Sequence, residues 1–147
     1  MKIKVLQRSF ITRYAGSFSS LSALRLCPTP RVEDTEGSEA VGCGESRFGE
    51  NTLSFTYVEE ETKISVTLKK AGDTLTVTRG GAQLRFCLGE STAFSYRTAY
   101  GEMPMEVYTE KLTLQEREGA TLLTLIYSAV LGGMAQKNEM RFKITKA

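Results

Sequence analysis

The fold of this chain is decided by residues 51–114, which read NTLSFTYVEEETKISVTLKKAGDTLTVTRGGAQLRFCLGESTAFSYRTAYGEMPMEVYTEKLTL. Apolar and polar side chains alternate through most of this stretch, and glycine-containing turns interrupt the alternation at short intervals. A period of two is typical of antiparallel strands that show one face to a core and the other to water. The stretch therefore predicts a run of consecutive antiparallel strands.

The flanking sequence extends this pattern, with further strands expected at 2–10, 40–48, 121–131 and 140–144. About eight to ten strands joined by short turns form a meander, and a meander of this length curls and closes on itself. We predict an all-β chain whose residues 1–147 form a single closed antiparallel up-and-down barrel. A two-sheet sandwich is the alternative.

The N-terminal residues 11–39 do not show the strand pattern and are expected to be an irregular insertion, either lid-like or poorly ordered. Within it, residues 16–26 could form a short helix that begins near Ser17 and ends at the prolines Pro28 and Pro30. The polar residues 31–39 that follow read as an exposed loop.

Two features are expected in the C-terminal half. The apolar parity changes within 103–114, which predicts a β-bulge near residues 108–110. Residues 121–131 are apolar on both parities, so this strand should be covered on both sides, either by the N-terminal segment or by another subunit. The second possibility gives an alternative function, a protein-interaction module that could form a homodimer through this strand.

Composition excludes several classes of function. The net charge is +2, from 19 basic and 17 acidic residues, which gives no reason to expect binding to nucleic acid. No segment approaches the roughly 20 apolar residues of a membrane span. Histidine is absent, so Ser-His and Cys-His nucleophiles are excluded and we expect no metal, no cofactor and no enzymatic activity. Three unpatterned cysteines predict free thiols and a cytoplasmic location.

Candidate site residues are polar side chains that share the parity of the apolar, inward positions. They are Arg79, Tyr57, Tyr96, Thr98, Tyr100, Tyr127 and Asn138. In a hollow barrel they would converge on a small ligand, partly apolar or anionic, and Arg79 could bind a carboxylate or phosphate.

A structural interpretation competes with this one, because a small barrel can be filled by its own side chains. Arg79 would then pair with an internal carboxylate or a tyrosine near the rim. The acidic run Glu59-Glu60-Glu61 reads most simply as a solvated turn.

One segment, Tyr96-Arg97-Thr98-Ala99-Tyr100-Gly101, resembles a motif of the YwiB-like family of small bacterial proteins. Thr78-Arg79-Gly80-Gly81 before it, Thr109 after it and Asn138 beyond the last hairpin match the same family pattern. The resemblance implies a calycin-like (lipocalin-like) β-barrel. It implies no activity, since the family has no established function.

Overall fold

The computed structural model describes residues 1–49, 52–59, 61–69, 73–79, 82–99 and 101–147, which form ten strands and one short helix. The elements are β1 (Lys2–Tyr14), α1 (Leu21–Leu26), β2 (Val32–Gly49), β3 (Thr52–Glu59), β4 (Thr62–Lys69), β5 (Thr74–Arg79), β6 (Ala82–Cys87), β7 (Ser91–Thr98), β8 (Gly101–Arg117), β9 (Ala120–Leu131) and β10 (Met134–Lys146).

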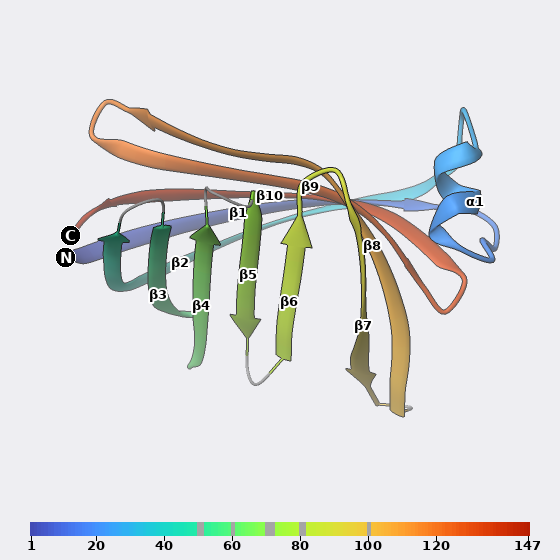
Figure 1. Ribbon diagram of the computed structural model, residues 1–147, viewed down its shortest axis with the longest axis horizontal. Coiled ribbons are helices and arrows are strands. Elements are labelled where there is room, and N and C mark those ends of the chain that lie inside the picture. Colours follow the sequence, from blue (N-terminus) through green and yellow to red (C-terminus); the bar gives the residue numbers. More distant parts are fainter. Residues whose placement is uncertain (50–51, 60, 70–72, 80–81, 100) are drawn as a thin grey trace.

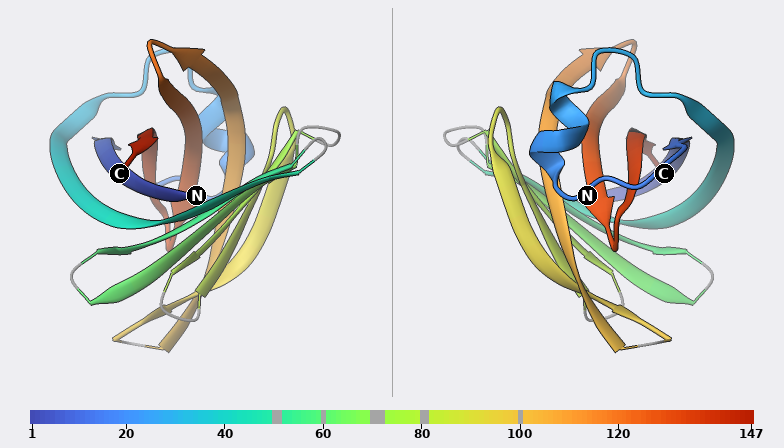
Figure 2. Two further views of the ribbon diagram at one scale, coloured as in Figure 1. Left: turned by 90° about the vertical axis from the view of Figure 1, so that its left-hand side faces the viewer. Right: turned by 90° about the vertical axis from the view of Figure 1, so that its right-hand side faces the viewer.

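The strands form one antiparallel sheet in the order β6-β5-β4-β3-β2-β1-β10-β9-β8-β7. Each ladder joins strands that are adjacent in sequence, apart from β1 and β10, which pair along almost their whole length. The sheet curls so that its two edges, β6 and β7, approach each other (Figures 1 and 2). The predicted all-β up-and-down barrel is therefore confirmed, in a nearly closed form.

The place where the sheet edges meet, between β6 and β7, is called the seam here. The Thr92 hydroxyl donates to the Arg85 carbonyl across it at 2.9 Å. The connection after β6 also bonds to β8, with Gly89 N–H donating to the Thr109 carbonyl at 2.9 Å. These hydrogen bonds connect the two ends of the sheet across the seam.

The barrel interior is built from the inward parity of the strands, as the alternation predicts. On β3, Leu53, Phe55 and Tyr57 are each at most 2% exposed, while the residues between them are half-buried. The core contains Ile3, Val5, Leu53, Phe55, Val66, Leu75, Phe86, Val107, Leu123, Leu125 and Phe142, all nearly or fully buried. Burying such side chains supplies most of the driving force for closing the sheet.

The prediction that residues 11–39 are irregular is wrong at both ends. Strand β1 continues to Tyr14, and β2 starts at Val32, so the insertion is confined to residues 15–31. The two strands pair from Lys2 to Tyr14, and this arm is solvent-exposed along residues 32–39 of β2. A strand with both faces in water has no hydrophobic alternation, so its sequence resembles a loop.

Charge pairs replace apolar contacts where residues 8–14 of β1 pair with residues 32–39 of β2. Arg8 Nε lies 2.6 Å from a carboxylate oxygen of Glu39, and Arg13 reaches both Asp34 and Glu36, at 3.4 and 2.6 Å. These are cross-strand neighbours on the exposed face, where opposite charges favour pairing. The polar run after Pro30 is therefore part of a strand.

The predicted helix exists but is shorter, because α1 covers only Leu21–Leu26. Its N-cap is Ser20, whose hydroxyl accepts from the Ala23 N–H at 3.2 Å, so the predicted start near Ser17 is wrong. Leu21 and Leu24 of the helix pack with Val130 and Ala135 on the outer face of β9 and β10 (Figure 2). One face of strand β9 thus lies against the barrel core. On its opposite face, the C-terminal end of the strand is covered by α1.

The bulge is confirmed, since the β8–β9 register shifts between Thr109 and Lys111 and leaves Glu110 as the extra residue. The hairpin between β9 and β10 turns at Gly132 and Gly133, both with positive φ, as a two-residue turn requires. The alternation in the sequence also predicts turns at residues 49–51, 59–61, 71–73 and 80–81, and these positions lie wholly or partly outside the described residues.

Candidate functional site

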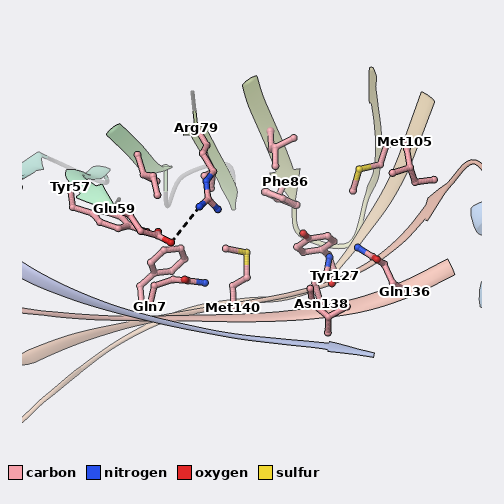
Figure 3. A pocket seen from close by; sticks show the side chains of 16 residues that line it. Gln7, Tyr57, Glu59, Arg79, Phe86, Met105, Tyr127, Gln136, Asn138 and Met140 are labelled. Atoms are coloured by element: carbon pink, nitrogen blue, oxygen red, sulfur yellow. Dashed lines mark hydrogen bonds and ion pairs between the residues drawn. The ribbon is translucent and has the colours of Figure 1, made fainter. Parts of the chain in front are cut away.

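The barrel interior contains a cavity of about 490 Å³ near the β9–β10 hairpin end. Eight strands line it, namely β1, β3 to β6 and β8 to β10. The barrel is therefore neither empty nor fully filled: Leu53 and Leu75 are buried in the core and do not line the cavity, whereas Tyr57 and Arg79 do. Figure 3 shows the side chains that surround the hollow part.

Most of the cavity wall is apolar. The apolar lining residues are Ile11, Ile64, Val77, Leu84, Phe86, Met105, Leu131, Met140 and Phe142. Phe86 and Tyr127 are in ring contact, with centroids 4.7 Å apart. Two flexible thioethers, Met105 and Met140, border the space.

One end of the cavity carries a charge pair. A guanidinium nitrogen of Arg79 lies 3.3 Å from one carboxylate oxygen of Glu59, from the ends of β5 and β3. The Arg79 side chain is 59% exposed, whereas that of Glu59 is only 14% exposed. The second Glu59 oxygen is buried and has no hydrogen-bond partner among the described residues.

Tyr57 lies beside this pair on the inward face of β3, two residues before Glu59, and is 2% exposed. Burial raises the pKa of the Tyr57 hydroxyl to about 12, and the Glu59 charge adds to the rise while Arg79 opposes it. The phenol therefore keeps its proton at neutral pH and can act as a hydrogen-bond donor. Gln7, from β1, is 7% exposed at the same end, and its amide donates to the Ser9 hydroxyl.

The other end of the cavity is polar but uncharged. Asn138 on β10 is 5% exposed, and its side-chain oxygen has no partner within the described part of the chain. It is directly opposite Tyr127 of β9 in the ladder, and Gln136 precedes it on the same face. Figure 3 shows these three toward one side of the pocket and Tyr57, Glu59 and Gln7 toward the other, with Met140 and Phe86 between.

Four of the seven predicted site residues come together in this cavity: Tyr57, Arg79, Tyr127 and Asn138. Tyr96 and Thr98 lie on β7, where the structure describes their backbone only, and Tyr100 lies outside the described residues. Arg79 does not point freely into the interior. It lies at the rim and pairs with a carboxylate, as the structural interpretation expected.

Three polar lining residues were missed from the sequence: Glu59, Gln7 and Gln136. The prediction that Glu59 lies in a solvated turn is wrong, because its side chain is largely buried. Its parity with Leu53, Phe55 and Tyr57 was the available signal. Gln7 likewise shares the parity of Ile3 and Val5, and Gln136 that of Asn138 and Met140.

A metal site requires several ligating side chains that lie close together. Over the described ranges, no three His, Cys, Asp or Glu side chains gather closely enough to hold a metal ion. Cys27, Cys43 and Cys87 are free thiols, and none lines the cavity. In the part of the chain that the structure describes, no helix has the length and apolar character needed to cross a bilayer.

Fold and cavity together define a small up-and-down β-barrel protein with a partly hollow interior. A family model described as "Domain of unknown function (DUF1934)" matches residues 30–143, so the chain belongs to this family. The chain is also similar to a solved structure, the crystal structure of ywiB protein from Bacillus subtilis. The two share 16% sequence identity with a TM-score of 0.60, over 99% of this chain and 93% of that chain.

The resemblance to the YwiB-like family inferred from the motifs is thereby confirmed. At this identity the likeness to the solved structure establishes the fold alone. No curated protein matches the chain.

Proposed function

We propose that this protein binds a small, partly apolar ligand in the barrel interior. The observation that carries the proposal is the cavity itself, about 490 Å³ lined by apolar side chains with polar groups at two ends. Ligand pockets typically occupy about 300–1,000 Å³ and combine an apolar wall with a few convergent polar groups. Protein interiors are normally close-packed and contain few voids larger than a water molecule, so a cavity of this volume is not expected of a core that serves packing alone.

The lining residues also suit a ligand that changes shape or varies in structure. The methionines Met105 and Met140 adjust to the ligand more readily than branched side chains do. The apolar wall would take up the body of the ligand, while Tyr57, Glu59 and Asn138 would orient it through hydrogen bonds.

The proposal is tested with N-phenylnaphthylamine, an uncharged apolar dye that fluoresces when it leaves water. We expect a saturable rise in fluorescence with the wild-type protein. In Gln136→Trp a large side chain enters the cavity, and dye binding should weaken several-fold. Circular dichroism melting would confirm that each variant is folded.

Gln83→Trp is the matched control, because Gln83 is exposed on the outward face of β6. It should bind the dye as the wild type does. A wild-type protein that gives no saturable signal, or two variants that bind equally well, would exclude binding in this cavity.

A further inference from the structure

The hydrogen-bonding state of Glu59 is incomplete. One carboxylate oxygen accepts from Arg79 at 3.3 Å, and the other is buried without a partner in the described residues. A buried oxygen that accepts no hydrogen bond is unfavourable, especially on a charged group, so such atoms are rare in folded proteins. Glu59 lines the cavity, so a ligand there can supply the missing donor.

The pairing with Arg79 also determines which ligand charge the site favours. Arg79 already faces the Glu59 carboxylate, so its positive charge is partly compensated. An anionic head group at this end would approach the unpartnered Glu59 oxygen and be repelled by it. An N–H donor, whether cationic or neutral, meets an acceptor that is already desolvated and fixed in place.

The register of the strands gives the shape of the rest of the ligand site. Along β10, Phe142 is opposite Gln7 of β1, Met140 is opposite Ser9, and Asn138 is opposite Ile11. The wall therefore runs from the charged end through an apolar section to the Asn138 amide, in the arrangement seen in Figure 3. An amide offers both a donor and an acceptor, so this second end accepts several neutral polar groups.

We infer that the cavity selects amphiphilic ligands whose polar head carries an N–H donor, such as an amine, and that Glu59 is the residue that accepts it. This inference rests on the proposed function, and it replaces the anionic ligand expected from Arg79 in the sequence. The apolar body of the ligand lies against Phe86 and Met140.

Three ligands with the same hydrocarbon chain separate these possibilities: decylamine, decanol and decanoate. Each compound is added in increasing amounts to the protein with N-phenylnaphthylamine bound, at neutral pH. The loss of dye fluorescence gives the affinity of each compound. We expect decylamine to bind about tenfold more tightly than decanoate, as one charge-assisted hydrogen bond provides. Decanol should lie between them.

Glu59→Gln keeps the size of the side chain and removes its charge. In this variant the affinity for decylamine should fall close to that for decanoate, while the affinity for decanol should change little. The ratio of two affinities within one variant is insensitive to a general loss of stability. Glu39→Gln, which breaks an exposed arginine pair on the outer surface, is the matched control and should keep the wild-type ratio.

The outcomes are distinguishable from failure of the proposed function. If the dye itself does not bind, the cavity is not a binding site and the proposed function fails. If the dye binds but none of the three compounds displaces it, the proposed function stands and the preference for amphiphiles with an N–H donor fails. If decanol and decanoate displace the dye as well as decylamine does, the cavity binds ligands but does not select for N–H donors. An unchanged amine-to-acid ratio in Glu59→Gln would show that another residue sets the preference.

Discussion

Tyr57 and Glu59 share the inward face of β3. The negative charge of Glu59 makes it harder for the Tyr57 hydroxyl to lose its proton. Burial is the larger cause, and together they raise the pKa of Tyr57 to about 12 from the usual 10.0. The protonated phenol is thus favoured in the folded state. The corresponding stability is fully present below pH 10 and is lost as the pH rises through 12.

Alkaline titration should detect this residue directly. We expect a tyrosinate absorbance step near pH 12 in the wild type that Tyr57→Phe removes, while Tyr108→Phe, outside the cavity, leaves it in place. Between pH 10 and 12 the free energy of unfolding should fall by about 2 kcal/mol more in the wild type than in Tyr57→Phe. Equal late steps in the wild type and Tyr57→Phe would contradict the assignment.

At this scale, parity allowed Tyr57, Tyr127 and Asn138 to be placed in the interior from the sequence. Parity did not predict that Arg79 forms an ion pair, because it fixes the direction in which a side chain points and not the residue that it contacts. The partner, Glu59, lies 20 residues away in sequence, within an acidic run that looks solvated. Only the β3–β4–β5 register, which sets Tyr57 opposite Ile64 and Ile64 opposite Arg79, brings the charges together.

At the scale of the elements, strand β2 contains glycines at which a side chain would meet the backbone of β3. Gly44 lies opposite Tyr57 of β3, and a Cβ built on Gly44 would lie 2.7 Å from the Tyr57 Cα and closer still to the Thr56 carbonyl oxygen. A backbone atom cannot rotate away as a side chain can. The close approach of β2 and β3, beside the Tyr57 end of the cavity, therefore requires glycine at this position.

Gly44→Ala should consequently destabilise the protein by about 3 kcal/mol or more, as overpacking against a fixed backbone does. Gly37→Ala on the same strand is the control, because its Cβ would have no neighbour nearer than 3.8 Å and should cost little. Chemical denaturation of both variants gives the comparison. Similar stabilities would show that β2 and β3 do not approach as closely as described.

The elements also show where sequence patterns are insufficient. The strands of the barrel wall were predictable because each has one face in the core. The beginning of β2 was not, since its residues 32–39 are exposed on both faces and are held by pairs such as Arg13 with Glu36. Helix α1 was displaced from its predicted start because Ser20, rather than Ser17, caps it.

For the whole molecule, alternation and short turns predicted the barrel but not the position of its seam. Each strand of a meander has the same pattern whether or not its far edge is paired, so the sequence does not distinguish β6 and β7 from the others. The structure leaves these two strands at the sheet edges, with contacts such as Thr92 to Arg85 between them.

Hydrogen exchange should reveal the seam. Amides on the outer edges of β6 and β7 are expected to exchange much faster than those of the β1–β10 ladder, which is paired on both sides. Mass spectrometry of peptides from the two regions measures the difference. Peptides of β6 and β7 that are as protected as those of β1 would indicate a fully closed barrel.

The position of the seam also determines the order in which the barrel can assemble. The strands β1 to β6 and β7 to β10 are two meanders of sequence-adjacent strands, joined by short connections except for residues 15–31 between β1 and β2, so each can form largely from its own hairpins. Joining them requires β1 to find β10, and the ladder between them pairs Ile3 with Lys146, from opposite ends of the sequence. Because this pairing joins residues that are far apart in sequence, its loop-closure entropy is large, and we expect formation of the β1–β10 ladder to be the slow step of folding.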